Sequence, residues 1–215
     1  AAADREWVPW RALLDIDLKR AAAELAAGCP PLPRRRVTLI TNVGQVALVK
    51  TTVDRAAERQ RWLSLDIEGD HQKLDCLGLA WSTDEAFVIP YHEDWQRALV
   101  RAVCESAAPK VLQNGAYDRD VLHRFNDITL QNHAFDTQLA WHAIQPELAG
   151  KKIQWSSRRG SRHTQKSLGF FASVYTREPY WKHLYGDATD ELYLCGIDVC
   201  VTLEVALKMQ EELDA

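Results

Sequence analysis

The stretch WLSLDIEG, residues 62–69, decides the fold that we expect for this chain. Apolar and polar side chains alternate strictly along it: Leu63, Leu65 and Ile67 face one way, and Ser64, Asp66 and Glu68 face the other. A period of two is the pattern of a β-strand that turns one face to a hydrophobic core. The opposite face of this strand carries two carboxylates only two residues apart.

Further runs of this kind predict a larger sheet around that strand. Residues 75–82 and 86–91 continue it as a three-stranded meander, and short strands are expected at 110–114 and 133–136. The run VTLIT at 37–41 predicts an additional edge strand. Helices are expected at 44–61, 93–107, 116–125, 137–145, 167–175 and 189–213. A meander followed by strands that alternate with helices predicts an α/β fold, with a mixed five-stranded sheet flanked by helices.

The N-terminal part of the chain has a different character. Residues 11–27 are rich in Ala and Leu and predict an amphipathic helix, which a segment rich in Pro, Gly and Arg follows at 28–36. We therefore expect an N-terminal helical extension and linker at 1–33 and the main domain at 34–215. Because the first residue is Ala1 and not methionine, the chain is expected to be a piece of a longer polypeptide.

Composition limits the class of protein. An apolar content of 47% permits a sizeable core, and the net charge of −4 gives no global attraction to nucleic acid. The five cysteines form no CxxC pair, which favours free thiols in a reducing cytosol. No apolar run approaches the roughly 20 residues that cross a bilayer, and no signal peptide is evident. We expect a soluble, cytoplasmic protein that has no contact with a membrane.

The two acids of the first strand suggest a metal site. Asp66 and Glu68 leave the same face of the sheet, and two like charges held this close raise each other's pKa unless a cation neutralises them. Mg²⁺ and Mn²⁺ prefer such oxygen ligands. The alternative interpretation is a solvent-facing strand that happens to carry two acids, because the pattern Asp-x-Glu is common.

Two later acids extend this hypothesis. In QNGAYD, residues 113–118, Asp118 falls in the first turn of an expected helix, where the helix dipole favours an acid. Asp198 lies in the expected helix 189–213 among Leu, Ile and Val, and a carboxylate in apolar surroundings is costly unless it is paired or metal-bound. The simpler alternatives are an ordinary first-turn acid and an acid exposed at a helix edge.

Taken in chain order, these segments resemble the DEDD superfamily of 3′→5′ exonucleases, which includes the proofreading domains of family A DNA polymerases and ribonuclease D. The matching stretches are LSLDIEG (63–69), LQNGAYD (112–118), FDTQLA (135–140), SLGFFASVYTREPYWK (167–182) and CGIDVCVTLEV (195–205). The similarity is closest to phage-type DNA polymerases and covers most of 37–213. It implies a ribonuclease H-like fold, hydrolysis at a 3′ end, and a bacterial or phage-encoded protein.

The resemblance also implies two divalent ions, Mg²⁺ or Mn²⁺. Asp66, Glu68 and Asp198 would hold the ion that generates hydroxide, and Asp66 and Asp118 would hold the second with the scissile phosphate. Two ions roughly 3.5–4 Å apart stabilise the attacking and the leaving oxygen of an in-line displacement. Asn114 would orient the site or contact the substrate. Asp136 would be a structural acid that accepts hydrogen bonds.

The superfamily pattern is incomplete at one catalytic position. A tyrosine four residues before the last Asp, or a histidine five before it, orients the attacking water in the superfamily. Here position 194 is Leu, and Tyr193 stands five before Asp198. Because one residue rotates a helical side chain by about 100°, Tyr193 reaches the water only if it precedes the helix. Gly69 also replaces the usual Thr after the second acid.

A basic segment predicts the substrate surface. Residues 151–166 contain cations and one Trp but no acid, a combination that suits a single strand whose phosphates meet cations and whose base stacks on the aromatic ring. Its candidates are Trp155, Arg158, Arg159, Arg162 and Lys166, with Tyr117 from the second motif. The surface would be extended by residues of the later stretch, with some of the aromatics in the core instead: Tyr175, Arg177, Tyr180, Trp181 and Lys182. A solvated loop is the alternative for the segment, and core packing for Tyr117. The Trp residues at 62, 81, 95 and 141 fit core positions better than binding positions.

Three functions remain open from the sequence. The first is a two-metal 3′→5′ exonuclease that releases nucleoside monophosphates from single-stranded DNA, in proofreading for a DNA polymerase in the same or a separate chain. The second is a ribonuclease D-like exoribonuclease, because nothing in the sequence separates DNA from RNA. The third is a catalytically silent domain that binds nucleic acid or braces a polymerase.

Overall fold

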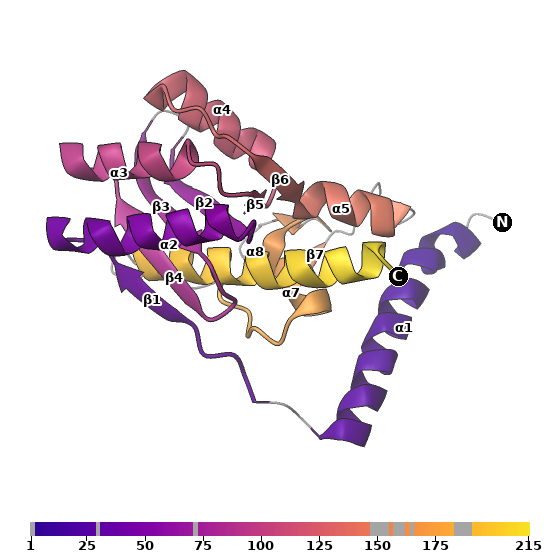
Figure 1. The fold of residues 1–215 in the computed structure, drawn as a ribbon. Helices are drawn as coiled ribbons and strands as arrows, with labels where there is room; N and C mark the ends of the chain where they lie inside the picture. The colour runs from indigo at the N-terminus through magenta and orange to yellow at the C-terminus, as the bar shows by residue number, and fades with distance from the viewer. Residues whose placement is uncertain are drawn as a thin grey trace.

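The computed structural model describes residues 3–28, 31–70, 73–146, 155–156, 162–163, 166–182 and 191–215. Its helices are α1 (Ala3–Ala27), the 3-10 turn η1 (Val43–Gln45), α2 (Val46–Glu58), α3 (Asp94–Cys104), α4 (Gly115–Asn126), α5 (Thr137–Ile144), α7 (Leu168–Tyr175) and α8 (Glu191–Leu213) (Figure 1). Its strands are β1 (Arg36–Leu39), β2 (Leu63–Gly69), β3 (Leu74–Ala80), β4 (Glu85–Pro90), β5 (Lys110–Leu112), β6 (His133–Asp136), β7 (Trp155–Ser156) and β8 (Arg162–His163).

The main sheet is mixed, as the sequence predicts. Its strand order is β1-β4-β3-β2-β5-β6. The pairs β2–β3 and β3–β4 are antiparallel, whereas β1–β4, β2–β5 and β5–β6 are parallel. The sheet has six strands, one more than the five expected. The additional strand is β1, the expected edge strand, which pairs with β4 and extends the meander. The expected basic loop also contains a short antiparallel ladder between β7 and β8.

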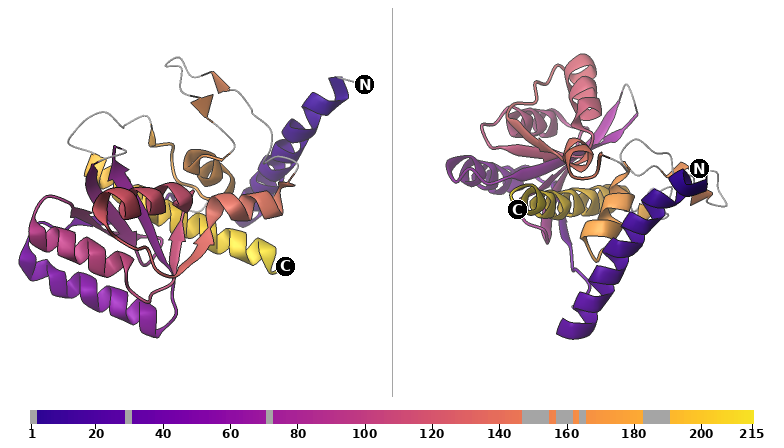
Figure 2. Two further views of the ribbon diagram at one scale, coloured as in Figure 1. Left: turned by 90° about the horizontal axis from the view of Figure 1, so that it is seen from above. Right: turned by 90° about the vertical axis from the view of Figure 1, so that its right-hand side faces the viewer.

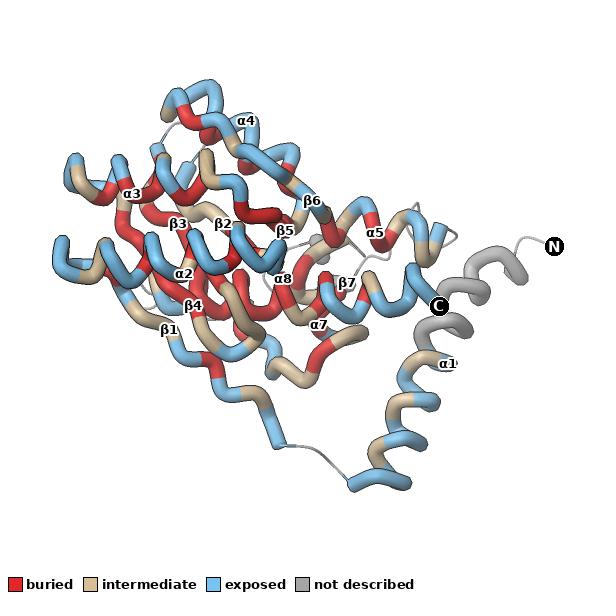
Figure 3. The backbone as a smooth tube through the Cα atoms, viewed as in Figure 1, coloured by how far each residue is buried: buried red, intermediate tan, exposed pale blue. Residues whose placement is uncertain are grey.

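The two faces of the sheet pack against different helices, as Figure 2 shows. Leu63 and Leu65 of β2 belong to a core cluster with residues of α2 and α3. On the other face, α8 packs through Val199 and Cys200 against Ala80 and Ala86 of the meander. Figure 3 shows the buried residues concentrated in the strands and in α8. The alternation in residues 62–69 therefore directs the even-numbered positions of β2 towards α8.

Helix α8 lies unusually close to β3 because of Gly78. A Cβ atom built at Gly78 would stand 2.8 Å from Sγ of Cys195 and 2.9 Å from Cγ1 of Val199, which is shorter than real Cβ contacts. Gly78 is the register partner of Asp66 on β2. This contact therefore brings the segment of α8 that carries Asp198 over the acidic part of β2.

Helix α1 lies to one side of the sheet and runs past α7 (Figures 1 and 2). The Arg20 guanidinium donates to the backbone carbonyls of Ser173, at 2.9 Å, and of Thr176. Glu24 forms an ion pair with Arg177 at 2.9 Å. The extension is thus tied by polar groups to the segment that follows α7.

Four of the cysteines lie in the part of the chain that the structure describes. Cys76, Cys104, Cys195 and Cys200 are free and buried. In the part of the chain that the structure describes, no helix is both long enough and apolar enough to cross a membrane.

We predict that Gly78→Ala lowers the free energy of unfolding by about 1–3 kcal/mol, because the added methyl group overpacks the contact with α8. Urea denaturation followed by circular dichroism measures the change. Thr51→Ala, on the exposed side of α2, is the control and is expected to have little effect. An unchanged stability of Gly78→Ala would contradict the close contact.

Candidate metal centre

The first two acids lie on the last part of β2. Asp66 and Glu68 are half-buried on the face towards α8, as their alternation with Leu65 and Ile67 predicts. One carboxylate oxygen of each lies within 4.8 Å of the other and of the Cys195 thiol. The two carboxylates therefore converge at the contact between the sheet and α8.

The third acid is held by the turn that starts α4. Asn114 adopts a left-handed conformation, with φ of 58°, and Asp118 occupies the first turn of the helix. Asp136 fixes this turn: its carboxylate accepts from the backbone amides of Asn114 at 3.3 Å and Gly115 at 2.8 Å. The same carboxylate caps α5 by accepting from Gln138 and Leu139. Asp136 is thus the structural acid that the sequence predicts.

The fourth acid is buried in α8 and has two partners from the segment after α7. Asp198 is 2% exposed. The Trp181 indole N–H donates to its Oδ1 at 2.5 Å. The Lys182 ammonium donates to its Oδ2 and forms an ion pair with it. The sequence suggests both residues only as an extension of the substrate surface and not as partners of Asp198, although YWK lies in one of the stretches that carry the resemblance.

The four carboxylates act on one another electrostatically, with Asp66 at the centre. Desolvation raises the pKa of Asp66 well above its ordinary value, and the negative charges of Asp118, Asp198 and Glu68 raise it further. The positive charge of Lys182 lowers it. Burial also raises the pKa of Asp118 to about 7, against the opposing effect of backbone hydrogen bonds. Such mutual repulsion is what divalent cations would relieve.

The Cys195 thiol lies beside this cluster but is a poor ligand for a hard cation. A hydrogen bond with Cys76, together with burial, raises the pKa of Cys195 well above its ordinary value. The group therefore stays a protonated thiol, and metal ligation requires a thiolate. Beside the thiol, Asp66 and Glu68 are carboxylates, as are Asp118 and Asp198, whose charges act on Asp66. Carboxylates are the kind of ligand that Mg²⁺ and Mn²⁺ prefer.

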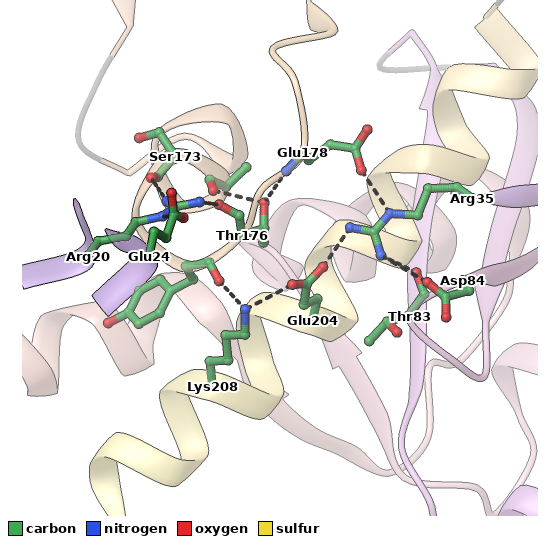
Figure 4. Close-up of polar contacts among 12 residues, drawn as sticks. Arg20, Glu24, Arg35, Thr83, Asp84, Ser173, Thr176, Glu178, Glu204 and Lys208 are labelled. Carbon is green, nitrogen blue, oxygen red and sulfur yellow. Dashed lines mark hydrogen bonds and ion pairs between the residues drawn. The ribbon is translucent and has the colours of Figure 1, made fainter. Parts of the chain in front are cut away.

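The segment that carries Trp181 and Lys182 is anchored by buried Arg35, as Figure 4 shows. Its guanidinium lies 2.8 Å from Glu178 and 2.6 Å from Glu204 of α8, and it also donates to the carbonyl of Thr83. Glu204 binds Lys208, which donates to the carbonyl of Tyr175 at 2.5 Å. This network joins the residue before β1 to α8 and to the end of α7, and Lys182 in the same segment lies against Asp198.

The structure places Tyr193 inside α8, and its side chain is 47% exposed. Five residues of helix separate it from Asp198, which turns it by about 140° around the helix axis. Tyr193 therefore does not precede the helix, which is the position from which it was expected to reach the water. Leu194 is buried in the core.

The other predicted substrate residues are placed only in part. Tyr117 is 39% exposed on α4. Lys166 is next to the second motif, because its carbonyl accepts from Gln113 at 2.8 Å. Arg158 and Arg159 lie outside the described residues, as do the side chains of Trp155 and Arg162, whose backbones form part of the β7–β8 ladder.

The departure at Gly69 has a local explanation. Its φ of +146° is a conformation that L-residues rarely adopt, and a Cβ atom there would stand 2.1 Å from the carbonyl oxygen of Lys73. The register with β3 shifts at this point. A threonine therefore does not fit here without a change in the turn.

Comparisons with solved structures relate this fold to nucleases and a polymerase. The polymerase domain of Pol1 from Mycobacterium smegmatis, in complex with a DNA primer-template and dNTP, matches 83% of this chain and 28% of its own, with a TM-score of 0.60 and 14% identity. The catalytic core of RRP6 from Trypanosoma brucei matches 86% of this chain and 50% of its own, with a TM-score of 0.56 and 16% identity. Escherichia coli RNase D, an exoribonuclease, matches 83% of this chain and 45% of its own, with a TM-score of 0.51 and 17% identity.

These matches confirm the ribonuclease H-like α/β fold that the resemblance to the DEDD superfamily implies. At such low identity they concern the fold, and this chain spans half or less of the length of each of the three proteins. No protein-family model and no curated protein sequence matches the chain.

We predict that Lys182→Met strengthens the binding of Mn²⁺ by about 10-fold, because the ammonium that competes for Asp198 is removed. Isothermal titration calorimetry on the metal-free protein measures this dissociation constant. Lys19→Met, which removes an exposed lysine–carboxylate contact with Asp15 on α1, is expected to bind Mn²⁺ as the unaltered protein does. Equal or weaker binding by Lys182→Met would show that Lys182 does not compete with the metal.

Proposed function

We propose that this chain is a two-metal 3′→5′ exonuclease that hydrolyses phosphodiester bonds at the 3′ end of single-stranded DNA and releases nucleoside monophosphates. The proposal is carried by the close approach of the Asp66 and Glu68 carboxylates on β2. It is supported by the effect of the charges of Asp118 on α4 and Asp198 on α8 on the pKa of Asp66. The likeness of the fold to nuclease structures supports the same conclusion.

The chain's own residues have distinct parts in this proposal. Asp66, Glu68, Asp118 and Asp198 hold the divalent ions, which when bound supply an activated water and neutralise charge on the phosphate. Asp136 fixes the left-handed turn at Asn114 and thereby orients Asp118. Trp181 fixes the orientation of the Asp198 carboxylate. Asn114, Tyr117, Trp155, Arg158, Arg159, Arg162 and Lys166 are proposed to contact the strand.

The proposal extends to the role of the chain in the cell. The motifs of the chain resemble those of the exonuclease domains of phage-type DNA polymerases, which favours proofreading beside a polymerase in the same or a separate chain. Residues 34–215 form the proposed nuclease domain, and 1–33 form the proposed extension. The buried free thiols fit the reducing conditions of a bacterial or phage-infected cytoplasm.

RNA is the second candidate substrate. It is favoured by the likeness of the fold to E. coli RNase D and to the core of T. brucei RRP6. The carboxylates serve either sugar equally well, because recognition of the 2′-hydroxyl requires separate contacts. A silent binding domain is the third candidate, and the displaced Tyr193 is the feature that favours it.

We expect the protein to shorten a 5′-labelled single-stranded DNA from its 3′ end with Mg²⁺ or Mn²⁺, and to be inactive in EDTA. Asp66→Asn is expected to lose at least about 100-fold in rate, because it removes a ligand shared by both ions. Denaturing gel electrophoresis of the products measures both effects. Asp120→Asn, an exposed acid-to-amide change elsewhere on α4, is expected to retain activity.

The same assay with RNA of the same sequence separates the three candidates. Degradation of RNA alone would replace the DNA proposal by the exoribonuclease. If the unaltered protein binds the strand but degrades neither DNA nor RNA, the silent binding domain is the candidate that remains.

We predict that Tyr193→Phe changes the rate of degradation by less than about 2-fold, because five residues of helix turn its position by about 140° from that of Asp198. Single-turnover kinetics with excess protein measure the rate. Asp198→Asn serves as the comparison and is expected to abolish cleavage. A loss of about 10-fold or more in Tyr193→Phe would instead place its hydroxyl at the reacting water.

A further inference from the structure

A second group of aromatic and cationic side chains lies at the opposite end of β2 from Asp66 and Glu68. Trp62 immediately precedes β2, and Trp81 immediately follows β3. The two tryptophans border a hollow of about 200 Å³, which Arg55, Arg59 and Arg61 also line. At about 3.3 Å per strand residue, Trp62 is about 13 Å from Asp66, so the hollow is separate from the carboxylates.

Each tryptophan is packed against a phenylalanine, which fixes its orientation. The ring of Trp62 lies 4.9 Å from that of Phe135, and the ring of Trp81 lies 4.2 Å from that of Phe87. Both residues are half-buried, so the expectation that they serve the core is met in part. Because they also border the hollow, they offer fixed aromatic surface to a ligand.

The hollow is cationic. Arg55, Arg59 and Arg61 are exposed, and in the described part of the chain no carboxylate lies within ion-pair distance of them or lines this hollow. Arg55 and Arg59 stand at the end of α2, where cations also complement the helix dipole. That explanation does not extend to Arg61, which lies beyond the helix; its amide is held by the carbonyl of Ala56 at 2.9 Å.

The charge around the tryptophans is one-sided. A wider hollow of about 480 Å³ continues past Trp62 and Trp81 towards the end of α8, where Glu211 and Asp214 line it. An anionic group is therefore attracted to the side of α2 and repelled from the side of α8. Trp62 and Trp81 lie between the cationic and the acidic side, where a flat aromatic group can stack on them.

We propose that this hollow is a second nucleotide-binding site, in which a base stacks on Trp62 or Trp81 and its phosphate is bound by Arg55, Arg59 and Arg61. Base stacking on an aromatic side chain and phosphate binding by arginine together recognise nucleotides without regard to sequence. The nucleotide is either part of a single strand, anchored away from the carboxylates, or a free nucleoside monophosphate.

Binding measured in EDTA tests the site apart from the proposed catalysis, because neither cleavage nor metal-dependent binding contributes. The two probes are a fluorescently labelled oligothymidylate, followed by anisotropy, and thymidine monophosphate, followed by calorimetry. The double variant Arg55→Ala/Arg59→Ala is expected to weaken binding by about 10-fold at low salt and to reduce the salt dependence for the oligonucleotide. Trp62→Leu is expected to weaken binding about 10-fold through the loss of stacking.

The control is Arg97→Ala/Arg124→Ala, which removes two exposed arginines from α3 and α4. Weaker binding of the oligonucleotide alone in the hollow variants identifies a strand anchor, and weaker binding of the monophosphate as well identifies a site for free nucleotides. If the control weakens binding as much as the arginine variant, or if neither probe responds to the hollow variants, the site does not exist. The arginine variant decides the matter should Trp62→Leu fail to fold.

Discussion

The close approach of α8 to β3 at Gly78 is the contact on which the candidate site depends. One helix supplies both the buried Asp198 and a large part of the core, so its distance from the sheet sets the distance between Asp198 and the acids of β2. A second tight contact, between Gly196 and Val37, holds the same helix against the edge strand. Because packed cores deform little, the close packing at these two glycines fixes the position of Asp198 relative to the acids of β2.

That geometry is electrostatically unfavourable in the absence of cations, and the chain compensates for it locally. Lys182 contributes a positive charge at Asp198, and backbone hydrogen bonds oppose the effect of burial at Asp118. The lysine is itself placed by the buried Arg35 network, which ties the end of α7 to α8. The repulsion among the acids is thus offset by groups in contact with them, one of which is positioned by a more distant network of ion pairs.

The sequence predicts those features that depend on local periodicity. The alternation along 62–69 assigns each side chain of β2 to the correct face, and QNGAYD correctly predicts Asp118 in a first helical turn. The contact of Trp181 and Lys182 with Asp198 was missed because it joins distant positions through a segment that has no repeat. The edge strand was not counted in the sheet because its pairing with β4 depends on tertiary position. The stretch YWK within the resemblance was the available signal for this contact.

Arg35 also defines how short a stable version of this domain can be. The residue lies just before β1, outside every regular element, yet its side chain is almost wholly buried between Glu178 and Glu204. A polypeptide that started after it would retain the complete sheet but would leave two partly buried carboxylates without their shared cation, which is strongly destabilising. The N-terminal limit for independent folding is therefore set by an ion pair and not by the first strand.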